Sequence, residues 1–158
     1  MRRAELCAHA AAIALALGLL LASAPARAAC TVSSTGVAFG AYNPQSGTPD
    51  DSTGTIQADC HPSDHDIQVD IGAGLSGSFA TRRMSSGAAT LNYNLYTNVA
   101  RTIVWGDGTG GSSNQILTSG SVSGGTRRFT GTVYGRIPAL QNVPAGTYGD
   151  TLIVTLTF

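Results

Sequence analysis

The sequence predicts an all-β protein with the architecture of an immunoglobulin-like sandwich. Short runs in which apolar and polar residues alternate recur along the chain, and clusters of Gly, Ser, Thr, Asn and Pro separate them. Twenty glycines occur in 158 residues, and hardly any stretch has helical periodicity. About seven to nine such runs follow one another at roughly 8 to 15-residue spacing, which is typical of a two-sheet sandwich.

Residues 1–28 have the organisation of a secretory signal peptide. Arg2 and Arg3 precede an apolar run over residues 10–22, and Ala26-Arg27-Ala28 supplies a small-residue cleavage site. The apolar run is about a dozen residues long, short of the roughly 20 that a membrane-spanning helix needs. We therefore expect cleavage after Ala28, export, and no membrane span.

Residues 29–158 are then expected to form one mature domain. This domain contains two cysteines, Cys30 and Cys60, which we expect to pair because exported proteins meet oxidising conditions. Such a bridge would contribute roughly 3 to 4 kcal/mol to stability in the chain-entropy picture.

The charge of the mature domain does not favour nucleic acid as a partner. Cleavage leaves six Arg and eight Asp, a net charge of −2. The basic clusters are the pairs Arg82-Arg83 and Arg127-Arg128, and we expect both pairs on a solvated face.

Four runs are predicted as half-buried strands, because each places aliphatic residues on one face and polar residues on the other. They lie at residues 67–71, 91–95, 129–137 and 152–158. Weaker candidates lie at residues 37–42, 55–60, 103–105 and 115–122. The polar, Gly-rich stretches 45–53 and 106–114 are predicted as loops at the ends of the sandwich.

The last predicted strand carries Leu152, Val154, Leu156 and Phe158 on one face, and its alternation continues to the final residue. Such a strand either lies inside a sheet or presents an edge with which another chain can pair.

Several patterns suggest cofactor, metal or catalytic chemistry, but their context argues against it. Residues 106–111 have the glycine spacing of a dinucleotide-binding loop without the helix that must follow it. Residues 59–66 bring together His61, His65 and three Asp, but Pro62 indicates a solvated loop. No Gly-x-Ser-x-Gly elbow occurs, and no Glu remains after residue 28. We expect no enzyme activity, no cofactor and no metal.

Taken in order, several segments resemble the spore coat protein U domain, the fold used by subunits of archaic chaperone-usher pili. The segments are Cys30, residues 37–44, residues 54–60, Arg83-Met84, and residues 91–96, 105–108, 133–138 and 146–151. Together they cover essentially the whole mature chain.

The resemblance implies an incomplete sandwich that lacks its last strand and has a hydrophobic groove beside the C-terminal strand. A periplasmic chaperone would lend a strand while the protein travels to the outer-membrane usher. In the fibre, the N-terminal extension of another pilus subunit would replace that strand. We expect Leu152, Val154, Leu156 and Phe158 to line the groove. The implied role is structural, in a surface pilus that serves cell adhesion and biofilm formation.

One departure from the family pattern affects the expected role. Fibre-forming subunits of this kind have a donor strand ahead of the first cysteine, whereas cleavage after Ala28 leaves only Ala29 before Cys30. The sequence therefore suggests a subunit that accepts a strand and cannot give one, as at a fibre tip.

Two other structural or binding roles remain open. A spore-coat or extracellular-matrix protein of the same fold would occur without chaperone and usher genes beside it. A secreted carbohydrate-binding module would need an aromatic platform, whereas the aromatic residues are scattered through the predicted strands, which favours core and edge packing. These residues are Tyr42, Tyr93, Tyr96, Trp105, Tyr134 and Tyr148.

Overall fold

The computed structural model describes residues 30–118 and 120–158, so the expected signal peptide lies outside the described residues. The described chain contains nine strands and one 3-10 helix: β1 (Thr31–Thr35), β2 (Asp50–Cys60), β3 (Asp66–Ile71), η2 (Gly74–Ser76), β4 (Arg82–Ser86), β5 (Ala89–Tyr96), β6 (Gln115–Thr118), β7 (Ser121–Ser123), β8 (Thr126–Ile137) and β9 (Val154–Thr157). In this part of the chain no helix has the length and apolar character needed to cross a bilayer.

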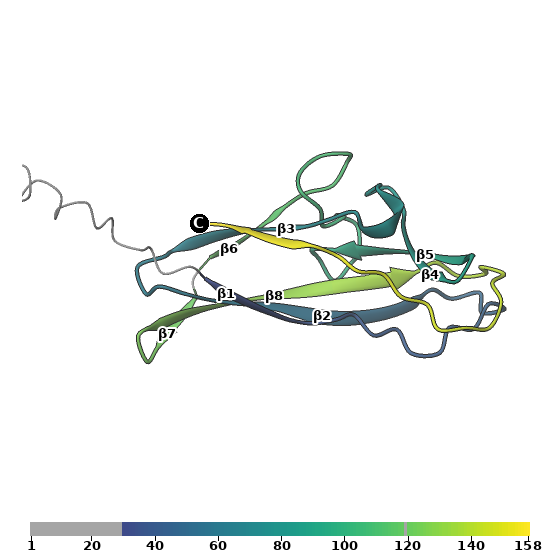
Figure 1. Ribbon diagram of the computed structural model, residues 1–158, viewed down its shortest axis with the longest axis horizontal. Coiled ribbons are helices and arrows are strands. Elements are labelled where there is room, and N and C mark those ends of the chain that lie inside the picture. Colours follow the sequence, from purple (N-terminus) through teal and green to yellow (C-terminus); the bar gives the residue numbers. More distant parts are fainter. Residues whose placement is uncertain (1–29, 119) are drawn as a thin grey trace, which may run out of the picture.

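The strands form two sheets that pack as a sandwich (Figure 1). The larger sheet has the order β1-β2-β8-β5-β4, and β7 also pairs with β8. The smaller sheet has the order β6-β3-β9. The ladders between these strands are all antiparallel. The prediction of an all-β, immunoglobulin-like sandwich is therefore confirmed.

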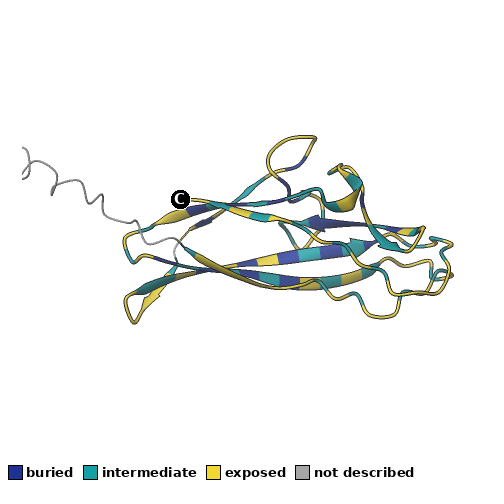
Figure 2. Ribbon diagram, viewed as in Figure 1, coloured by how far each residue is buried: buried dark blue, intermediate teal, exposed yellow. Residues whose placement is uncertain are grey.

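The long pair β2 and β8 shows how the sequence alternation builds the core. Their register runs from Asp50 opposite Ile137 to Cys60 opposite Arg127. Because side chains alternate between the faces of a strand, every second residue of β8 from Phe129 onward is buried (Figure 2). Gly131 belongs to this buried row, and a Cβ atom there would lie 3.1 Å from the Trp105 ring. The glycine thus leaves room for Trp105, which is fully buried.

The predicted disulfide between Cys30 and Cys60 is present. It joins the residue before β1 to the last residue of β2, and Cys60 is part of the core. The bridge therefore fixes the N-terminal end of β1 against β2 and closes a loop with a sequence separation of 30 residues.

The prediction that Arg82 lies on a solvated face is wrong, because Arg82 is fully buried. Its Nε donates to the Gly72 carbonyl at 3.0 Å, and Nη1 donates to Asn94 Oδ1 at 2.8 Å. Nη2 donates to the carbonyls of Ile71 at 3.1 Å and Trp105 at 2.7 Å. Burial lowers the pKa of Arg82 below its ordinary value. The guanidinium thus links the end of β3 in one sheet to β5 in the other.

The structure also differs from the predicted strands in several places. Residues 37–42 are not a strand: Gly40, inside the run, has a positive φ of 75°, and the Ala38 carbonyl accepts a hydrogen bond from the Ser52 hydroxyl at 2.6 Å. Residues 103–105 contribute only isolated bridges at Val104 and Trp105. The run 115–122 divides between β6 and β7, which belong to different sheets. Sequence alternation missed β1 and β4 altogether.

Candidate functional site

Two strand edges face a hollow between the sheets. Within residues 30–118 and 120–158, strand β1 pairs with β2 alone and strand β9 with β3 alone, so each lies at the edge of its sheet. An edge strand presents unpaired N–H and C=O groups with which a further strand can pair. Residues from both edges line one cavity of about 300 Å³.

The main-chain groups of β9 divide between the two sides of the strand. The Gly72 N–H donates to the Ile153 carbonyl at 2.8 Å, and Thr155 and Thr157 lie opposite Asp70 and Gln68. Because residues of an antiparallel strand alternate in direction, the main-chain groups of residues 153, 155 and 157 face β3. Those of Val154 and Leu156 therefore face the open edge.

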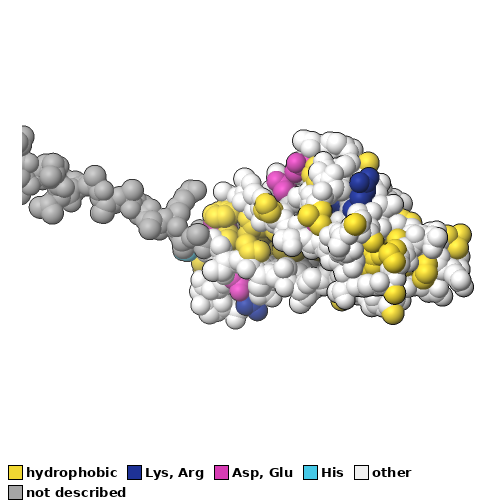
Figure 3. All heavy atoms as spheres, turned by 45° about the vertical axis from the view of Figure 1, so that its right-hand side comes forward, with side chains coloured by type: hydrophobic (Ala, Val, Ile, Leu, Met, Phe, Trp, Pro, Cys, Tyr) yellow, Lys and Arg dark blue, Asp and Glu magenta, His cyan; other side chains and the backbone are white. Residues whose placement is uncertain are grey.

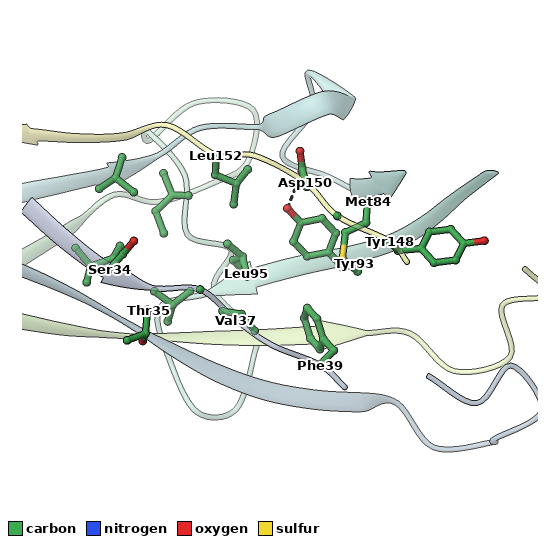
Figure 4. A pocket seen from close by; sticks show the side chains of 16 residues that line it. Ser34, Thr35, Val37, Phe39, Met84, Tyr93, Leu95, Tyr148, Asp150 and Leu152 are labelled. Carbon is green, nitrogen blue, oxygen red and sulfur yellow. Dashed lines mark hydrogen bonds between the residues drawn. The ribbon is translucent and has the colours of Figure 1, made fainter. Parts of the chain in front are cut away.

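The cavity is lined mainly by apolar side chains from both sheets (Figure 4). Thr35, Val37 and Phe39 come from β1 and the segment that follows it, and they lie across the cavity from Leu152. The floor is formed by strands on both sides of the sandwich: Ile56, Ile71, Met84, Tyr93, Leu95 and Val133. We call this cavity the groove.

A second hollow of about 590 Å³ extends the groove. It shares Val37, Phe39, Met84 and Tyr148 with the groove, and it continues between residues 40–44 and residues 143–147. Hydrophobic side chains are exposed in a broken band along the molecule on one face (Figure 3). The described chain therefore carries an extended depression with apolar walls beside its buried core.

The wall of the groove that precedes β9 connects the two sheets. Gly149 and Ser85 of β4 exchange two main-chain hydrogen bonds, of 2.9 and 3.1 Å, while the Ile153 carbonyl accepts from the N–H of Gly72, just after β3. Residues 149–153 thus pass from the edge of the larger sheet to the edge of the smaller one. This crossing places Leu152 and Val154 against the cavity.

The same wall contains one polar pair. The Tyr93 hydroxyl donates to Asp150 Oδ2 at 2.7 Å, and the Leu75 N–H donates to Asp150 Oδ1 at 3.1 Å. Burial raises the pKa of Tyr93 most, and the hydrogen bond to Asp150 raises it further, so the Tyr93 hydroxyl stays protonated and acts as a donor. Gly74 has a positive φ of 65°, and a Cβ atom there would collide with Asp150 and Leu152. The glycine lets η2 approach the carboxylate closely.

The structure brings only part of the expected groove residues to the cavity. Leu152 and Val154 line it. Leu156 lies opposite Val69 and packs against the core, and the Phe158 side chain is 50% exposed and lies outside the cavity lining. The assignment of these residues to strand binding remains a prediction.

Sequence reasoning missed most of the opposite wall. Val37 and Phe39 belong to the run 37–42, where the pattern predicts a strand and indicates no binding role, and Tyr93 and Asp150 lie 57 residues apart. The alternation of Val37 and Phe39 was the available signal, since both side chains point into the groove (Figure 4).

The other patterns singled out in the sequence are turns in the structure. Asp107 Oδ1 accepts hydrogen bonds from the N–H and hydroxyl of Thr109 within the Gly-rich loop. The His61 ring is bonded to the Ser63 hydroxyl, and the His61 N–H to Asp64, in an exposed turn. Cys30, Cys60 and Asp64 lie close together, but both sulfurs are used in the disulfide and so provide no thiolate for a metal.

Trp105 and Tyr93 are buried in the core rather than displayed on the surface. Neither ring can therefore serve as part of an exposed platform for sugar binding.

Comparisons with known proteins identify relatives of this chain. A family model described as "Spore Coat Protein U domain" matches residues 16–155. Over 88 residues, 54% of this chain and 45% of the relative, the chain is 41% identical to "Protein U" of Myxococcus xanthus. The match thus spans less than half of that relative's length.

A solved structure shares the fold. A chain in the crystal structure of the CsuC-CsuE chaperone-tip adhesion subunit pre-assembly complex, from archaic chaperone-usher Csu pili of Acinetobacter baumannii, aligns with a TM-score of 0.54 and 24% identity. The alignment covers 82% of the present chain and 39% of that chain.

Proposed function

Because the chain belongs to the Spore Coat Protein U domain family, we propose that it is an exported structural subunit whose sandwich is completed by a β-strand of another polypeptide. The observation that carries this proposal is the apolar groove between two open strand edges, β1 and β9. The added strand belongs to a neighbouring subunit, so completing the fold links the two subunits within a surface pilus or fibre.

The open edge of β9 and the apolar cavity would hold an added strand in different ways. The main-chain groups of Val154 and Leu156 face the open edge and can bond to an incoming strand, which gives affinity. Every second side chain of that strand enters the apolar cavity, which gives specificity. Burial of those side chains provides most of the favourable free energy, at about 25 cal/mol per Å² of apolar surface.

The proposed partners are a periplasmic chaperone during transit, an outer-membrane usher, and other pilus subunits in the fibre. The likeness of fold to a chain of a chaperone-tip adhesion subunit complex supports this choice. The protein would pass through the periplasm and act at the cell surface. A structural role needs no cofactor and no catalytic residues.

We further propose that the subunit accepts a strand without donating one. Cleavage after Ala28 would leave one residue ahead of Cys30, and Cys30 itself is fixed to β2 by the disulfide. Determining the N-terminal sequence of the exported protein checks this point. Self-polymerisation of the purified subunit through its N-terminal segment would contradict it.

Expression in a bacterial periplasm tests the proposed function. With a chaperone of the archaic chaperone-usher class, we expect a soluble one-to-one complex, whereas the subunit alone aggregates or is degraded because its groove is exposed. The matched control is the same chaperone with the groove-facing residues of its donor strand replaced by Asp, which should not protect the subunit. A well-folded monomer that ignores the chaperone would contradict the proposal.

A spore-coat or extracellular-matrix role is the second candidate, and the description of the matching family, "Spore Coat Protein U domain", supports it. In that case the domain would be stable without a donated strand. The expression experiment distinguishes the two roles, since a self-sufficient domain is recovered equally well with and without the chaperone.

A further inference from the structure

The groove has a defined order of positions along its wall. Val154, Leu152 and Asp150 follow one another at two-residue intervals and all line the cavity. A strand lying beside this wall places its alternate side chains about 6.6 Å apart. Its successive inward side chains therefore face Val154, Leu152 and Asp150 in turn, and we call these the first, second and third positions.

The first two positions are apolar and the third is not. Val154 lies opposite Ile71, and Leu152 lines the cavity together with Val37 and Leu95 (Figure 4). At the third position the Tyr93 hydroxyl donates its hydrogen bond to Asp150 Oδ2, and the Leu75 N–H donates to Asp150 Oδ1. The lone pairs that remain on these three oxygens can only accept hydrogen bonds.

Among the described residues around the third position, no side chain offers a free donor to a carboxylate. The Tyr148 hydroxyl, on the same wall, donates to the Pro144 carbonyl at 2.8 Å. Arg82 lies behind the wall, but it is fully buried and its donors are bonded to the carbonyls of Ile71, Gly72 and Trp105 and to Asn94. Phe39 and Met84 also line this part of the groove, and both side chains are apolar.

From this arrangement we propose that the Tyr93–Asp150 pair selects the partner strand by its third inward residue. This proposal rests on the proposed function. The partner carries aliphatic side chains at the first two positions and an uncharged hydrogen-bond donor, such as Ser, Thr or Asn, at the third. A carboxylate at the third position is rejected, because it would lie against the Asp150 charge without a donor.

The test uses synthetic peptides of about ten residues, roughly 33 Å when extended. All have Val and Leu at the first two inward positions, and the third is Thr, Val, Asn or Asp. We expect Thr to bind a few-fold more tightly than Val of the same shape, and Asn to bind at least about tenfold more tightly than Asp. Dissociation constants are measured by fluorescence anisotropy.

Variants of the subunit identify the cause of any selection. Asp150→Asn keeps an acceptor for the Leu75 N–H and adds an amide donor, so the Asn-to-Asp ratio should fall to about twofold or less. Asp66→Asn removes the same charge from an exposed position at the start of β3 and should leave the ratio unchanged. Moving Asn from the third to the second position of the peptide should weaken binding, which fixes the register.

The outcomes separate this inference from the proposed function. Tight binding of all peptides regardless of the third residue would leave strand acceptance intact and overturn the selection. Preference for Asn that persists in Asp150→Asn would also overturn it. Failure of every peptide to bind would overturn the proposed function and the inference with it.

Discussion

Replacing Leu152 with Asp is expected to weaken binding of a donor strand by roughly 100-fold or more. Leu152 lines the groove at its second position and packs against the core. A carboxylate at this place would have to lose its hydration when a strand covers it, and the surrounding side chains are apolar. The measurement is the dissociation constant for a donor peptide, or recovery of the chaperone complex from the periplasm.

The adjacent residue provides the matched control. The Ile153 side chain is 75% exposed on the outer side of the same segment, so Ile153→Asp changes the charge and hydrophobicity equally without entering the groove. We expect Ile153→Asp to bind strands like the parent protein. Equal losses in the two variants would show that the groove does not hold the strand.

Replacing Arg82 with Met is expected to lower the free energy of unfolding by about 3 to 5 kcal/mol. Met fills much of the space but donates no hydrogen bond, so the carbonyls of Ile71, Gly72 and Trp105 and the Asn94 oxygen would be left without this donor. Replacement of a buried ion pair by apolar residues can be neutral, because both charges leave together. Here the partners include main-chain carbonyls, which no side-chain substitution removes.

The effect of Arg82→Met can be measured by urea denaturation of the strand-completed protein. Arg83→Met is the control, because Arg83 is the next residue of β4 and is exposed. We expect the denaturation midpoint of Arg83→Met to match the parent within error. A similar small change for Arg82→Met would refute the view that its guanidinium holds the two sheets together.

How far the sequence predicts this fold depends on which faces of the strands are buried. β3, β5 and β8 each bury a row of alternate apolar residues in the core, so their alternation is clear. β1 is exposed along its whole length in the described structure and shows no such signal. The single-faced burial that sequence periodicity detects is missing in β1, whereas β9 at the other open edge retains it.

The candidate site was predictable on one side only. Leu152 and Val154 stand in an alternating run, whereas Val37 and Phe39 lie in an irregular segment between glycines. Arg82 and Asp150 could not be placed, because charged residues in a sequence indicate solvent exposure by default. Only the fold shows that main-chain carbonyls satisfy Arg82 and that Tyr93 and Leu75 satisfy Asp150.

Amide hydrogen exchange along β9 tests most directly whether the groove accepts a strand. For this purpose an alternating apolar strand is fused after Phe158 through a short Gly-rich turn, with a second fusion whose inward residues are Asp as the control. The Thr155 and Thr157 amides face β3 and should be protected in both proteins, whereas those of Val154 and Leu156 face the open edge. We predict slow exchange at Val154 and Leu156 in the apolar fusion alone. Fast exchange at these two amides in the apolar fusion, beside protected Thr155 and Thr157, would contradict the account.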